Sequence, residues 1–244
     1  ATIARRLVRQ YAGPMHESLN SLAHRQWPLP TGNWRWQQSW LDLAFIHYRV
    51  AIADLRSLVP AQLTIEECDG TAWVSLVPFR MAGVRRRPFP CLPGMGEFLE
   101  LNLRTYVSFR GQPGVWFFSL EAESLPIVMG GRMVYHVPYH WARLSCTRHQ
   151  DVVNWTSQRR LGRGACQLSY RIGRDPVAAP PGSLIHWLTE RYFLYAGTAS
   201  RLWQVPVHHA PWELRTGELL AHDGNLLALA GIAADLSEPL LQYS

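Results

Sequence analysis

Hydrophobic and polar residues alternate along several segments in the pattern of β-strands. The clearest is 97–109, EFLELNLRTYVSF. Because successive side chains of a strand point to opposite faces, this segment has one polar and one apolar face. The polar face carries Glu100, Asn102, Arg104 and Tyr106, and the apolar face carries Leu99, Leu101, Leu103, Thr105 and Val107. Further strands are predicted over 34–50, 63–79, 115–124, 139–148, 151–160 and 165–173.

Turn and breaker residues separate these strands. Asp69-Gly70 between two apolar runs predicts a hairpin. Short helices are expected over 14–26, 51–60, 125–135 and 180–192. The proline- and glycine-rich segment 80–96 is expected to be mostly loop, of the length that often forms a functional lid.

The order of these elements favours a mainly β fold. Nine to eleven strands follow one another through hairpins and not through βαβ units, which indicates an antiparallel sheet closed into a barrel or a sandwich. We see no linker that divides the chain. We therefore expect a single domain over 1–244, with 1–33 as an N-terminal helical extension.

Composition narrows the possible partners and location. The net charge is +6 and the pI about 9.5, but the arginines are scattered and join no nucleic-acid motif, so we expect no nucleic-acid partner. No apolar run approaches the roughly 20 residues that span a bilayer, so we expect no membrane association. The four cysteines form no CxxC pair, which favours free thiols in the cytoplasm.

All 24 basic residues, histidine aside, are arginine, and the sequence contains no lysine. This excludes side-chain Schiff bases, a pyridoxal phosphate linkage and a lysine general base. Histidines are present, but Pro138 lies between His136 and His140 and argues against a helical metal site. We therefore expect neither a metal nor a cofactor.

Several segments in a fixed order resemble the YqjF-like family of bacterial proteins. They include WLDLAFIHYRV (40–50), ELNLRTYV (100–107), GQPGVWFFSLEA (111–122), LTERYFLY (188–195) and VHHAPWEL (207–214). That family is grouped by fold with acetoacetate decarboxylase. The resemblance implies a closed, cone-like antiparallel β-barrel with peripheral helices and a ligand-sized interior.

The decarboxylase carries a run of Gly-Arg, an aromatic residue and Pro-Lys-Lys beside its cavity. The run GRMVYHVPYH is similar in Gly131, Arg132, Tyr135 and Pro138. The two lysine positions fall on Tyr139 and His140, so the Schiff-base nucleophile is missing. Fold similarity does not carry function across such a change.

We interpret the polar strand and this run as one acid/base site that acts on a carbonyl or carboxylate substrate without a lysine. The expected catalytic residues are Glu100, Arg104, Tyr139 and His140. The expected substrate-binding residues are Asn102, Tyr106, Trp116, Phe118 and Arg132. Histidine would act as general base, tyrosine would donate to an oxyanion, and an arginine would bind a carboxylate.

Period-2 alternation allows one of Tyr139 and His140 to face the site, and we expect Tyr139 there, bonded to Glu100 or Arg132. His140 would lie outside or at the rim. Two other interpretations stay open. The polar residues form a structural network or a solvent-exposed face, or the barrel binds a hydrophobic or aromatic small molecule without catalysis. The small-molecule ligand is the expected partner, and a homo-oligomer is left open.

The absence of lysine gives a direct chemical prediction. Borohydride reduction in the presence of a keto acid should fail to trap any side chain of this chain, because no ε-amino group forms a reducible imine. Peptide mass spectrometry of the reduced protein checks this. A borohydride-stable adduct mapped within the barrel would contradict it.

Overall fold

The protein is described by a computed structural model that defines residues 17–90, 96–197 and 201–244. Its elements in chain order are η1 (Glu17–Asn20), β1 (Trp36–Leu41), β2 (Ala44–Val50), α2 (Ile52–Arg56), β3 (Thr64–Ile65), β4 (Ala72–Arg86), β5 (Glu97–Phe109), β6 (Gln112–Ala122), α3 (Leu125–Tyr135), β7 (Tyr139–His149), β8 (Val152–Arg159), β9 (Ala165–Pro176), α4 (Leu184–Thr189), β10 (Phe193–Gly197), β11 (Leu202–Pro206), β12 (Arg215–Gly224), α5 (Leu226–Leu229) and β13 (Asp235–Tyr243).

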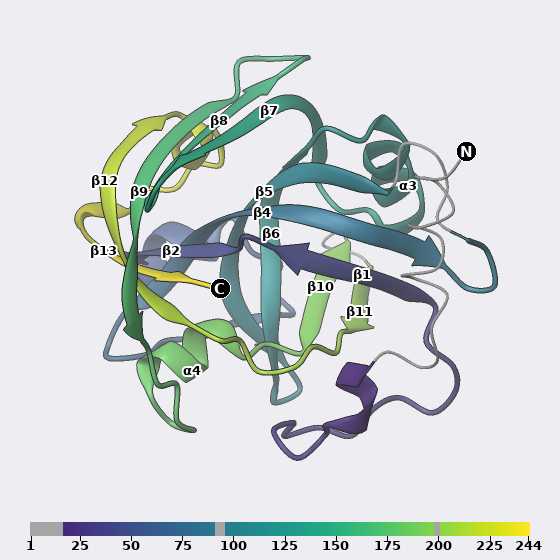
Figure 1. Cartoon of the computed structure of the whole chain (residues 1–244). Helices are drawn as coiled ribbons and strands as arrows, with labels where there is room; N and C mark the ends of the chain where they lie inside the picture. The colour runs from purple at the N-terminus through teal and green to yellow at the C-terminus, as the bar shows by residue number, and fades with distance from the viewer. Residues whose placement is uncertain (1–16, 91–95, 198–200) are drawn as a thin grey trace.

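The strands form one thirteen-stranded sheet that closes into a ring, which confirms the mainly β fold. The closed path runs β5-β6-β7-β8-β9-β12-β13-β2-β4 and returns to β5, with β1, β3, β10 and β11 attached at its sides. In Figure 1, β7 and β8 form the top of this ring and β9 and β12 form its left side. Most neighbouring strands are antiparallel, as the hairpin signals predicted.

Two strand pairs differ from that prediction, because β6 pairs in parallel with both β7 and β10. Helix α3 carries the chain from β6 to β7, so the chain contains a β-helix-β crossover. A parallel neighbour cannot be reached through a hairpin, and it needs such a connection. The crossover brings Tyr139, the first residue of β7, beside Leu120 of β6.

Three local predictions are also corrected. The predicted strand 34–50 breaks at Asp42, which has a φ of 52°. The predicted loop 80–96 is strand as far as Arg86, where β4 pairs with β1, and Gly83 adopts a φ of 61° within it. The described part of the predicted helix 14–26 holds only the 3₁₀ turn η1. Residues 91–95 of the loop and residues 1–16 of the extension 1–33 lie outside the described residues.

The interior of the ring is a continuous apolar core. It receives alternate side chains from the ring strands, among them Ile46, Tyr48, Leu103, Leu144, Trp155 and Tyr170. The other faces of β8 and β9 are exposed, as Asn154 and Gln167 show. This clean alternation marks a sheet with one side on the core and the other in water.

Strands β2, β4 and β5 are instead buried on both faces. Their outer face is covered by α3, α4 and the segments 177–190 and 206–214, which pack into two further apolar clusters. Trp187 of α4 lies against Tyr106 at 4.8 Å between ring centroids, and the Arg191 guanidinium lies 5.1 Å from the same ring. This cover turns the outer face of three strands into a second interior.

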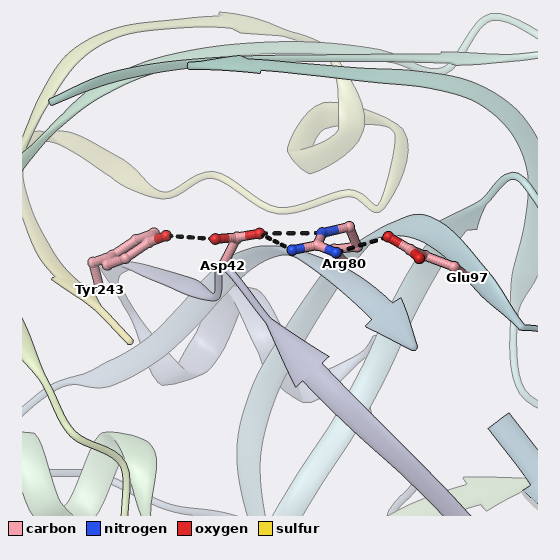
Figure 2. Close-up of polar contacts among 4 residues, drawn as sticks. All are labelled: Asp42, Arg80, Glu97 and Tyr243. Carbon is pink, nitrogen blue, oxygen red and sulfur yellow. Dashed lines mark hydrogen bonds and ion pairs between the residues drawn. The ribbon is translucent and has the colours of Figure 1, made fainter. Parts of the chain in front are cut away.

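A polar network holds the corner between β1 and β2. Asp42 accepts two hydrogen bonds from Arg80 at 2.6 and 3.1 Å and a third from the Tyr243 hydroxyl at 3.0 Å. Arg80 also pairs with Glu97 at 2.7 Å. Figure 2 shows the four side chains in one row. The row ties the corner to β4, β5 and β13, and the Arg80 guanidinium contributes to holding the pKa of Asp42 below its usual range.

Among the described residues, none of the helices combines the length and the apolar character that crossing a bilayer requires.

Candidate functional site

The polar face of β5 is buried, but on the outer side of the ring. Leu101, Leu103 and Val107 point into the ring core. Glu100 and Arg104 point the other way, beneath the cover, and expose only 1% and 4% of their surface. The ligand-sized interior that the resemblance implied therefore does not include this face. The polar row is buried because helices and loops cover the strand from outside.

Glu100 and Tyr139 meet across three strands. The Tyr139 hydroxyl donates to the Glu100 carboxylate, at 3.3 Å from each oxygen. Burial raises the pKa of Glu100 to about 8, against the opposing effect of hydrogen bonds from Tyr139 and Asn102. Glu100 is therefore largely protonated at neutral pH. A protonated carboxyl beside a hydroxyl donor is able to serve as a general acid.

Tyr139 is held in place by α3. A Cβ atom on Gly131 would lie 2.4 Å from Cδ2 of Tyr139, so the helix packs directly on the ring through a residue without a side chain. Part of Tyr139 remains accessible to solvent, while its hydroxyl end lies at the buried carboxyl. Burial and the neighbouring Glu100 raise the pKa of Tyr139 well above its usual value, so the phenol stays protonated and acts as a donor.

Arg104 is a buried cation without adequate partners. Its Nε and Nη2 atoms are buried, and neither makes a hydrogen bond within the structure described here. The guanidinium carbon lies 5.4 Å from the ring centroid of Phe45 and 5.9 Å from that of Tyr106. Aromatic faces compensate a buried cation only in part, and an unsatisfied guanidinium is costly. This position therefore favours an anion that fills the missing bonds.

His47 is a site residue that sequence reasoning missed. Its Nδ1 atom lies 2.6 Å from the Ser75 hydroxyl and 3.0 Å from the Tyr106 hydroxyl, and these two hydroxyls lie 2.6 Å apart. Burial, together with the nearby Arg104 charge, lowers the pKa of His47 to about 3, so the imidazole is neutral. His47 therefore adds a hydrogen-bonding group to the site and no charge.

Strand register explains this row of side chains. His47 is the partner of Ser75 across β2 and β4, and Ser75 is the partner of Arg104 across β4 and β5. Paired residues share a face of the sheet. Polar residues at matching positions in 44–50 and 72–79 were the available signal, but the pairing that aligns them was not readable from the sequence.

Of the other predicted site residues, some lie with Glu100 on the covered face and some do not. His140 points to the ring interior, beside buried Glu121, which forms an ion pair of 2.7 Å with Arg159. Burial lowers the pKa of His140. Arg132 is exposed on α3. Asn102 and Tyr106 stay with Glu100 and Arg104 on the covered face. The four predicted catalytic residues therefore divide, and three of them share one face.

Trp116 and Phe118, like His140, lie on the side of the sheet that is away from Glu100. They pack against the ring core and line a surface groove of about 210 Å³ with Leu58, Pro138 and Tyr195. A register shift between Leu103 and Arg104 in the β5–β6 pair alters the alternation here, so their parity does not follow that of the polar row. Their predicted contact with a substrate of Glu100 is not supported by this placement. Within the described ranges, no three His, Cys, Asp or Glu side chains group as metal ligands.

Comparisons with solved structures define the fold class. The chain is similar to acetoacetate decarboxylase from Legionella pneumophila, with a TM-score of 0.62 and 13% identity, covering 89% of this chain and 88% of that one. It is also similar to the enduracididine biosynthesis enzyme MppR, with a TM-score of 0.59 and 16% identity, covering 86% and 84%. The fold is that of the acetoacetate-decarboxylase-like proteins.

Sequence comparison then gives the family. A family model described as uncharacterized conserved protein, DUF2071, matches residues 37–244. The protein YqjF of Bacillus subtilis (strain 168) is 38% identical over 217 residues, which cover 88% of this chain and 90% of that protein. The chain belongs to the DUF2071 family.

The packing of α3 on Tyr139 yields a matched pair of substitutions. Gly131→Ala should destabilise the protein by roughly 1–3 kcal/mol, because its new methyl group overlaps the Tyr139 ring. Gly130→Ala meets no atom within 4 Å and should be neutral or stabilise the helix by up to about 1 kcal/mol. Urea unfolding of both variants checks this. Equal effects would show that Tyr139 does not occupy the described position.

The raised pKa of Glu100 predicts a dependence of stability on pH. The carboxyl titrates near 4.5 when unfolded and near 8 when folded, so the folded state holds the proton more tightly. Its contribution is complete below pH 4.5 and is lost as pH rises towards 8, by at most about 1.4 kcal/mol per pH unit. Urea unfolding between pH 6.5 and 9 should show that Glu100→Gln removes this fall. An identical slope in wild type and variant would contradict the assignment.

Proposed function

We propose that this chain is a small-molecule enzyme that binds a carboxylate substrate at Arg104 and transfers protons at its carbonyl group through Glu100 and Tyr139. The observation that carries the proposal is the buried guanidinium with two unpaired nitrogens. Arginine binds carboxylates through parallel hydrogen bonds, so a carboxylate supplies the acceptors that the protein does not.

The spacing of the polar row suits this division of roles. Glu100 and Arg104 lie four residues apart on one face of β5, which corresponds to about 13 Å between their Cα atoms. Both side chains are long enough to converge on a small molecule between them. A substrate whose carboxylate is bound at Arg104 would have its carbonyl group on the side of Glu100 and Tyr139.

The proton chemistry follows from the environments of the two groups. Protonated Glu100 donates its proton to the carbonyl oxygen, and the Tyr139 hydroxyl donates to the carboxylate that remains. That carboxylate accepts the proton lost from the carbon next to the carbonyl group, which gives the enol and restores the acid form of Glu100. Neutral His47 is a further hydrogen-bonding group near Arg104. No step uses an amine, in keeping with a sequence without lysine.

The structural neighbours lend context to the choice of substrate class. MppR has been solved in complex with pyruvate, a small oxo acid. The identity to that protein is 15%, so the likeness supports the fold, and the substrate class rests on Arg104. The proposal includes a small molecule as partner and no nucleic acid.

Carbon-bound proton exchange tests the proposal. Wild-type protein should accelerate the exchange of methyl or methylene protons of pyruvate or acetoacetate in D₂O, followed by ¹H NMR. Glu100→Gln and Tyr139→Phe should each lower the rate at least tenfold, an increase in barrier of about 1.4 kcal/mol. Arg104→Met should raise the half-saturating concentration.

His140→Ala is the matched control, because His140 lies on the opposite face of β7 and should leave the exchange rate unchanged. Binding of the acids without exchange would favour the alternative, a non-catalytic barrel for small molecules. Exchange that survives Glu100→Gln and Tyr139→Phe would remove this pair from the mechanism.

A further inference from the structure

Two aromatic side chains form a chain of contacts that begins at Arg104. The Arg104 guanidinium carbon lies 5.4 Å from the Phe45 ring centroid, and that ring is stacked on His47 at 6.0 Å between centroids. Trp212 packs on Phe45 at 5.7 Å with the ring planes at 71°. The contacts therefore lead from Arg104 to Phe45 and from Phe45 to Trp212.

Trp212 also faces an open groove. The groove has a volume of about 650 Å³ and is lined by Trp212, Val177, Leu214 and Tyr243, with Arg148 and Arg215 at its edge. Both arginines are exposed. Trp212 is thus the side chain shared by the groove and the aromatic wall of the buried site.

The segment that carries Trp212 belongs to neither helix nor strand over residues 207–214. Its backbone is held by hydrogen bonds from Val207 to Tyr192, from Arg25 to Val207 and from Val177 to Leu214. The Trp212 indole donates to the Thr189 carbonyl at 3.2 Å and is stacked on His209 at 4.7 Å between ring centroids. Rotation of this indole would break that hydrogen bond and that stacking, and would leave the backbone bonds of the segment in place.

We propose that the groove is the entrance to the buried site and that Trp212 is its gate, which opens to admit an anionic ligand to Arg104. The side chains that line the groove include two arginines and one acidic residue, Glu213, so their net charge is positive and attracts anions toward this entrance. The closed indole excludes water from Arg104, which strengthens hydrogen bonds to a bound carboxylate. The nature of the ligand rests on the proposed function, whereas the route rests on Trp212 itself.

The other end of the site offers a competing route. Tyr139 is partly accessible beside α3, and Val128 of that helix is buried in the same apolar cluster as Phe45. Val128→Ala removes packing on that side, as Trp212→Leu removes packing on the groove side. The two variants therefore compare the two routes.

Modification of arginine by 2,3-butanedione measures access to Arg104. The reagent is small, and mass spectrometry of Glu-C peptides quantifies each arginine separately. In wild type, Arg104 should resist modification while exposed Arg148 and Arg215 react. Trp212→Ala should raise the rate at Arg104 at least tenfold, Trp212→Leu and Trp212→Phe should raise it by successively less, and Val128→Ala should leave it at the wild-type rate.

Each other result has a defined meaning. Arg104 that stays unreactive in Trp212→Ala, while Arg215 reacts, overturns the gate. Equal acceleration in Val128→Ala overturns it as well, because the opening would not be specific to the groove. If Trp212→Ala fails to show a cooperative thermal transition, the comparison of Trp212→Phe with Trp212→Leu decides by the same criterion.

Acetate separates the gate from the proposed function. In the opened variant, 50 mM acetate should slow the modification of Arg104 by at least threefold, relative to the same concentration of chloride, and should not slow that of Arg215. Acceleration by Trp212→Ala without protection by acetate would support the gate and count against Arg104 as a carboxylate site.

Discussion

The structure depends on the burial of β5 on both of its faces. A strand with one apolar and one polar face ordinarily leaves the polar face in water. Here Glu100, Asn102, Arg104 and Tyr106 are all buried, because α3, α4 and the segment 206–214 cover them. Burial of four polar side chains costs free energy unless each finds a partner. Glu100 is protonated and His47 is neutral because burial disfavours their charged forms.

The two titratable groups reduce the cost by losing their charge, and Arg104 does not. Glu100 holds its proton to about pH 8 and His47 stays neutral to about pH 3. Arginine keeps its proton at any physiological pH. Arg104 therefore keeps its positive charge among aromatic rings, with two nitrogens that make no hydrogen bond. Arg191, on the same Tyr106 ring, also has one buried nitrogen without a partner, but its charge is paired with Glu66 at 2.5 Å. The missing ion pair favours Arg104 as the arginine that binds a ligand.

The sequence predicted those features that depend on local alternation. It placed Leu101 and Leu103 on one face of a strand and Glu100 and Arg104 on the other. It also gave Glu100 or Arg132 as the partner of Tyr139, and the structure has Glu100 there. The sequence did not predict the features that depend on contacts between distant segments. Whether a strand face lies inside the ring or under a cover depends on where α4 and Trp212 pack, and nothing in β5 encodes that. The His47–Ser75 row likewise needs the register of β2 on β4, and the parallel pairing of β6 and β7 depends on the crossover through α3.

The tyrosine at the start of β7 limits the chemistry that is possible on this face of the fold. Tyr139 has no amine and so cannot form an imine with a carbonyl. Burial and the neighbouring Glu100 raise the pKa of its phenol well above the usual value, so the phenol remains a hydrogen-bond donor. A protonated carboxyl is therefore more useful beside it than a carboxylate, since both groups then donate to a ligand oxygen. The tyrosine and the raised pKa of Glu100 therefore act in the same direction. In the proposed mechanism, the two donors would stabilise negative charge that develops on a substrate oxygen.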